Sequence, residues 1–113
     1  MGYLASIKSL LTGESHIYIS DYNDAYDNIV CITPYAGNPI HTFDSTIRKV
    51  YFQIMLRDTS STNLETRAES IISTLDRYES TSMAIFLSDD VIPGKRDEKK
   101  RSISYINFEV ILK

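Results

Sequence analysis

The 113-residue sequence contains one cysteine, Cys31, and no tryptophan. A disulfide framework needs cysteine pairs, and the usual structural zinc sites need two to four cysteines, so both classes are excluded. The chain must therefore depend on a hydrophobic core, for which its length is sufficient. Cys31 lies in the β-branched run 29–32 with no basic residue or histidine beside it. We interpret it as a buried, unreactive thiol.

Glycine is also scarce, with four residues scattered along the chain. Loops that cradle phosphates or dinucleotides need clustered glycines, and none of these fingerprints is present. Nucleophile elbows are missing as well. The two histidines, His16 and His41, are far apart in the sequence and form no zinc pattern. We therefore expect a non-enzymatic protein with no cofactor and no metal.

Long hydrophobic runs are absent. A membrane-spanning helix needs about 18 or more apolar residues in succession, and no window approaches that length. The first eight residues lack the basic start and the continuous apolar stretch of a signal peptide. We expect a protein that folds in a reducing cytosol and has no membrane partner.

Three aspartates, Asp21, Asp24 and Asp27, recur at intervals of three in a segment that also contains asparagine. An EF-hand loop needs oxygen ligands two residues apart, glycine at position six and glutamate at position twelve. Tyr26 and Ile32 occupy those two positions, so an EF-hand is excluded. We interpret the aspartates as turn-forming residues, with a looser cation site as the alternative.

The spacing of apolar residues predicts two helices and five strands. One helix is expected over residues 3–12, and the other from a capping box at Thr62 and Glu65 to about Tyr78. The expected strands cover residues 16–20, 29–32, 47–57, 83–87 and 102–113. The order α-β-β-β-α-β-β predicts one α+β domain over residues 1–113. Its antiparallel or mixed sheet would be covered by the two helices.

The predicted strand 47–57 carries apolar residues on both of its faces. Val50, Phe52, Ile54 and Leu56 share one face, whereas Tyr51 and Met55 lie on the other with Gln53 and Arg57. A strand with one solvated face normally alternates apolar and polar residues. We therefore expect Tyr51 and Met55 to be covered by a neighbouring subunit.

Residues 95–101 are seven consecutive charged residues. They sum to +3, while the whole chain has a net charge of −3 and the remainder therefore −6. One interpretation is a solvated hairpin tip. The other is an arm that docks on an acidic neighbour or touches phosphate. Its basic residues lack interleaved aromatics and the chain is acidic, so specific nucleic-acid binding is not indicated. The candidate contact residues are Lys95, Arg96, Lys99, Lys100 and Arg101.

Three stretches, 28–39, 50–57 and 68–75, carry a family resemblance. They contain a strand that ends in Tyr-x-Gly-x-Pro, a strand with Gln-x-x-x-Arg, and an amphipathic helix after a polar turn. The chain resembles small phage proteins labelled minor capsid proteins, and it is similar to the tail-terminator (tail-completion) proteins of long-tailed phages. It departs from the family at Asp58, where a small residue is common, and residues 95–101 have no counterpart that we can map.

The resemblance implies a structural virion protein at the head–tail junction, assembled in the host cytoplasm. Six copies would form a ring that caps the tail tube, stops its growth and contacts the head connector. DNA would pass through the lumen without specific binding, since an acidic ring repels it. We expect Arg48 and Arg57 to serve subunit contacts in such a ring. The alternatives are a head-closure ring and a monomeric binding module that adds a strand at a sheet edge.

Overall fold

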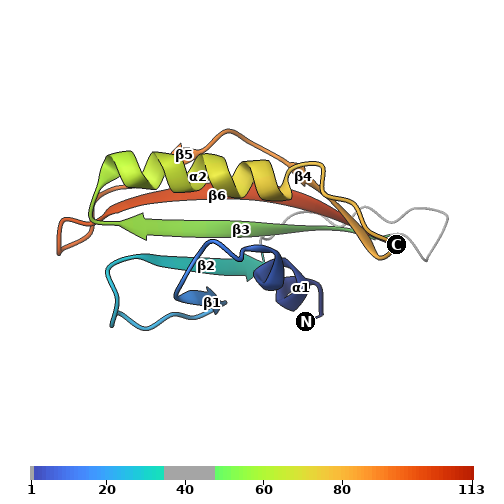
Figure 1. Ribbon diagram of the computed structural model, residues 1–113, viewed down its shortest axis with the longest axis horizontal. Helices are drawn as coiled ribbons and strands as arrows, with labels where there is room; N and C mark the ends of the chain where they lie inside the picture. The colour runs from blue at the N-terminus through green and yellow to red at the C-terminus, as the bar shows by residue number, and fades with distance from the viewer. Residues whose placement is uncertain (1, 35–47) are drawn as a thin grey trace.

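The computed structural model describes residues 2–34 and 48–113 (Figure 1). The elements are α1 (Gly2–Leu10), β1 (Ile17–Ile19), β2 (Ile29–Pro34), β3 (Arg48–Asp58), α2 (Ser61–Leu75), β4 (Met83–Leu87), β5 (Ile92–Pro93) and β6 (Ser102–Leu112). The α+β class is confirmed. The expected order missed one short strand, β5, which lies between the predicted strands 83–87 and 102–113. The turn predicted at 35–39, His41 and Ile47 lie outside the described residues.

The six strands form one mixed sheet in the order β1-β2-β3-β6-β4, and β5 pairs with β6 on the same side as β4. Only the β1–β2 pair is parallel among the described strands. The centre is the antiparallel pair of β3 and β6, whose register runs from Arg48 opposite Leu112 to Asp58 opposite Ser102. Figure 1 shows these two strands as the longest arrows, with α2 lying along β6.

Both helices pack on the same face of the sheet, which we call the helix face. Alternate side chains of β3 and β6 point into this layer, and the Phe52 and Phe108 rings stack with centroids 5.1 Å apart. The helices and the residue after α1 add Leu4, Ile7, Leu11, Leu64, Ala68, Ile71 and Leu75 to the same buried cluster. The period of two in the strands and the three-to-four spacing in the helices thus produce one core.

The two ends of α2 differ from the prediction. The N-cap is Ser60, whose Oγ accepts a hydrogen bond from the Asn63 N–H at 3.3 Å, so the capping box assigned to Thr62 and Glu65 is wrong. The helix ends at Leu75 rather than near Tyr78, because Asp76 adopts an extended conformation. Tyr78 still packs against the core, which explains why the apolar spacing misled the prediction.

The segment after α2 closes the outer edge of β4. The Ile85 N–H donates to the Tyr78 carbonyl at 2.8 Å, and the Arg77 N–H donates to the Ile85 carbonyl at 2.7 Å. The Leu87 N–H donates to the Asp76 carboxylate at 2.8 Å. These bonds occupy the backbone groups that an added strand would need, so this edge is protected from pairing with another chain.

Candidate subunit interface

The opposite side of the sheet, which we call the helix-free face, is not covered by any helix of the described residues. One row of side chains crosses five strands on this face, in the order Tyr18, Cys31, Met55, Tyr105 and Ile92. Cys31 and Met55 are buried within a small cluster, Tyr18 and Tyr105 are half-buried, and Ile92 is 43% exposed. The row is therefore apolar but only partly shielded from water.

A second row lies nearer the start of β3 and contains Phe86, Glu109 and Tyr51. Phe86 and Tyr51 are partly exposed. The Lys49 ammonium lies 3.0 Å from the Glu109 carboxylate and 5.7 Å from the centre of the Tyr51 ring. The hydrogen bond to Glu109 raises the pKa of Lys49.

Polar side chains lie between the two rows, where the Gln53 amide donates to Asn107 at 3.0 Å. The helix-free face therefore alternates apolar bands with satisfied polar groups, as protein interfaces do. Tyr51 and Met55, the two residues predicted for subunit contact, both lie on this face. Their contact with a neighbour stays a prediction.

At one end of the helix-free face, the acidic loop 21–27 folds over Arg57. The side chain of Arg57 is 3% exposed, and its guanidinium pairs with the Asp24 carboxylate at 2.9 Å. It also donates to the backbone carbonyls of Tyr26 and Asp27, and it lies 5.4 Å from the centre of the Tyr22 ring. Arg57, predicted for subunit contact, is thus engaged within its own chain. A charge reversal there would disturb the monomer and would not isolate a contact between subunits.

The basic segment meets the same acidic loop. Arg101, 5% exposed in its side chain, pairs with Asp24 at 2.8 Å and with Asp97 at 2.7 Å. Lys99 pairs with Asp24 at 3.0 Å. The hydrogen bonds from Lys99 and Arg101 hold the pKa of Asp24 well below its usual range. We call this group, with Arg57 and Asp27, the Asp24 cluster. The acidic neighbour expected for residues 95–101 therefore includes a loop of the same chain.

The remaining predicted cations stay outside the Asp24 cluster. Lys95, Arg96 and Lys100 are exposed and form no ion pair within residues 2–34 and 48–113. The backbone of Arg48 begins β3 opposite Leu112. Sequence reasoning missed the pairing of loop 21–27 with residues 95–101. Their opposite charges were a usable signal, but nothing in the sequence placed them side by side.

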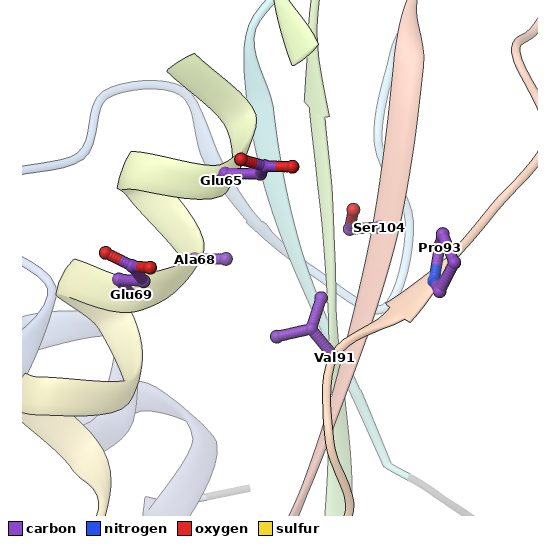
Figure 2. A pocket seen from close by; sticks show the side chains of 6 residues that line it. All are labelled: Glu65, Ala68, Glu69, Val91, Pro93 and Ser104. Carbon is purple, nitrogen blue, oxygen red and sulfur yellow. The ribbon is translucent and has the colours of Figure 1, made fainter. Parts of the chain in front are cut away.

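A groove of about 320 Å³ lies on the helix face between α2 and β5. Figure 2 shows Glu65, Ala68 and Glu69 on the helix side and Val91, Pro93 and Ser104 on the strand side. The two glutamates are exposed and make no ion pair with another described residue. The groove was not predicted from the sequence, because β5, which forms one of its walls, was not among the predicted strands.

Within residues 2–34 and 48–113, neither α1 nor α2 has the length and apolar character that a membrane-spanning helix needs. His16 stacks on the Tyr26 ring with the ring centres 3.6 Å apart, which is a packing role for this histidine.

Comparison with known proteins identifies a family. A family model described as bacteriophage tail terminator protein matches residues 3–113. A search of curated proteins finds no significant match.

Proposed function

This chain belongs to the bacteriophage tail terminator family, and from that membership we propose that it forms a ring, hexameric as the resemblance implies, at the head–tail junction. The ring caps the finished tail tube, stops further addition of tube subunits and joins the tube to the head connector. Membership of the family makes the protein a structural component of the phage tail. Assembly takes place in the host cytoplasm before the protein enters the virion.

The observation that carries the ring is the one-sided covering of the sheet. Both helices pack on the helix face, while Tyr18, Phe86, Ile92 and Tyr105 remain partly exposed on the other side. Apolar bands of this kind on a small protein mark surfaces that a partner covers. In a closed ring every copy has a neighbour, so the helix-free face of every copy can be covered in the same way.

The charge distribution supports passage of DNA without binding. Each copy carries a net charge of −3, so a ring has a strongly negative field that repels phosphate. Three cations of the helix-free face, Lys49, Arg57 and Arg101, are already paired with carboxylates. Phosphate contacts by those side chains would require breaking these pairs.

The closed outer edge of β4 argues against the monomeric module that adds a strand at a sheet edge. The backbone groups on that edge are bonded to residues 76–78. The opposite edge strand, β1, has three residues, which offers little room for an added strand.

The test is to make phage particles without this protein and to image them. The proposal expects tails longer than normal and not joined to heads, because no cap stops the addition of tube subunits. Normal-length tails beside heads that have lost their DNA would instead assign a head-closure role. Mass measurement of the purified protein with tail tubes should show a ring, and a chain that stays monomeric with tubes would overturn the proposal.

A matched pair of variants tests the helix-free face. Tyr51→Glu places a carboxylate on this face, in register with Glu109, whereas Thr81→Glu places one in the exposed turn before β4. We expect Tyr51→Glu to weaken ring assembly on tubes by roughly tenfold or more, since a buried carboxylate must lose its hydration. Thr81→Glu should assemble as the unaltered protein does. Equal assembly of both variants would remove Tyr51 from the interface.

A further inference from the structure

The groove between α2 and β5 has an unusual charge pattern. The exposed residues of α2 are serine, threonine and asparagine, apart from Glu65 and Glu69. These two carboxylates are four residues apart, at one wall of the groove (Figure 2). Like charges at this spacing repel each other. No cation of the described residues pairs with them, so a cation from outside the molecule would relieve the repulsion.

The rest of the groove suits a lysine or arginine side chain. Ala68, Val91 and Pro93 supply apolar surface beside the two carboxylates. Long basic side chains bury their methylene stems on apolar surface and direct the charged head to an acidic group. The groove therefore offers both parts of a binding site for such side chains.

The same molecule carries the complementary group. Lys95, Arg96 and Lys100 are exposed on the turn 95–100, which we call the basic tip. The turn is held in shape by Asp97, whose carboxylate accepts the backbone N–H groups of Lys99 and Arg101 at 3.0 and 2.9 Å. A preformed turn loses little conformational freedom on binding, which favours its use as a contact.

The groove and the basic tip lie at the same end of the molecule but on opposite faces. Asp58 at the end of β3 is in register with Ser102 at the start of β6. Helix α2 begins shortly after Asp58, and the basic tip ends just before Ser102. The groove opens on the helix face, because Ser104 is in register with Leu56 of the core. The basic tip is anchored on the helix-free face through Arg57 and the Asp24 cluster.

We propose that the basic tip of one copy docks in the groove of the next copy, with Glu65 and Glu69 receiving Lys95, Arg96 or Lys100. This inference rests on the ring of the proposed function. Copies placed side by side in the same orientation, helix face against helix-free face, bring groove and tip to the same level. Contacts of this kind are heterologous, and they close into a ring when the rotation between copies allows it.

The test reverses the charges on each side in turn. Glu65→Lys with Glu69→Lys should raise the protein concentration needed for half-assembly on tubes by roughly a hundredfold, because like charges would then face each other. Lys95→Glu, Arg96→Glu and Lys100→Glu together should have a similar effect. One chain with both sets of changes restores the complementarity, and it should recover most of the assembly.

The control is Asp89→Lys with Asp90→Lys. These carboxylates are also exposed and lie near β5, but they do not line the groove. The control changes the net charge by the same amount as Glu65→Lys with Glu69→Lys. Because it leaves the groove unaltered, it should assemble as the unaltered protein does. Circular dichroism and thermal melting of every variant check that the monomer is folded.

The outcomes separate this inference from the ring itself. If the unaltered protein forms rings and the groove variant assembles equally well, the docking is wrong and the ring stands. If the groove variant forms rings but no longer binds tubes, the groove takes a tube protein, and the docking of a second copy is also wrong. If the unaltered protein forms no ring with tubes, the proposed function fails together with this inference.

Discussion

Arg67 shows how a single side chain joins separate parts of this fold. Its guanidinium pairs with Glu14 at 2.7 Å and with Asp58 at 3.1 Å. It also donates to the backbone carbonyls of Arg57 and Ile29. The Asp58 carboxylate is 2% exposed, and its cationic partner lies on α2.

Replacing Arg67 by methionine should strongly destabilise the monomer. The substitution keeps an apolar stem but leaves the buried Asp58 carboxylate without its cation. Breaking such a pair costs about 3–5 kcal/mol. Urea unfolding at pH 7 measures the change in unfolding free energy. Adding Asp58→Asn should recover part of the loss, and a loss below about 1 kcal/mol in the single variant would contradict the role assigned to Arg67.

The ion pairs of Asp24 should make the stability of the monomer depend on pH. Its pKa is held below the ordinary value of 3.8 by hydrogen bonds from Lys99 and then Arg101. A carboxyl whose pKa is lower in the folded state stabilises the fold fully above its unfolded pKa, and this contribution is lost as the pH falls below it. We therefore expect Asp24→Asn to have a lower urea midpoint than the unaltered protein at every pH between about 5 and 7. The difference from the unaltered protein should shrink below about pH 4.

The control for Asp24 is Asp21→Asn in the same loop. Asp21 is exposed and forms no ion pair with the rest of the described chain. Its substitution should leave the urea midpoint unchanged across the same pH range. A difference between Asp24→Asn and the unaltered protein that persists unchanged at pH 3 would show that the ion pairs of Asp24 are not its cause.

At the scale of elements, local patterns were sufficient to find most helices and strands. β4 was predicted with its observed bounds, and β6 differs by one residue at its end. The missed strand β5 has two residues, one of them Pro93, so it carries no periodicity to read. Helix ends depend on single side chains rather than on periodicity, which is why both ends of α2 were misplaced.

The N-cap of α2 is open to a direct test. Ser60→Ala removes the Oγ that accepts the Asn63 N–H, and loss of an N-cap of this kind costs about 1 kcal/mol. Thr62 is exposed within the first turn, so Thr62→Ala should change the unfolding free energy by less than about 0.5 kcal/mol. Urea unfolding of the two variants compares them. A larger loss of unfolding free energy for Thr62→Ala than for Ser60→Ala would show that Thr62 is the N-cap.

At the scale of the whole molecule, the two faces of the sheet differ in what covers them. Phe108 is fully buried on the helix face, whereas Phe86 is partly exposed on the helix-free face. The asymmetry follows from the packing of both helices on one side. It separates residues that fold the monomer from residues left available to a partner.

Alanine substitution of these two phenylalanines should separate folding from assembly. Phe108→Ala should cost about 3–5 kcal/mol of monomer stability, as a large core truncation does. Phe86→Ala should cost less than half as much, because water already reaches this side chain, yet it should weaken ring assembly on tubes. Urea unfolding and mass measurement give the two quantities. Equal losses of monomer stability would mean that the helix-free face is sealed within one copy.

The sequence by itself determined the α+β class, most of the elements, and the apolar faces of the long strands, because periodicity is a local property of neighbouring residues. It also predicted that residues 95–101 form either a solvated hairpin tip or an arm that contacts an acidic neighbour or phosphate. Only the tertiary structure decided that loop 21–27 supplies part of that charge and that both helices lie on one face. These outcomes depend on contacts between residues far apart in the chain, which strand order sets and local spacing does not.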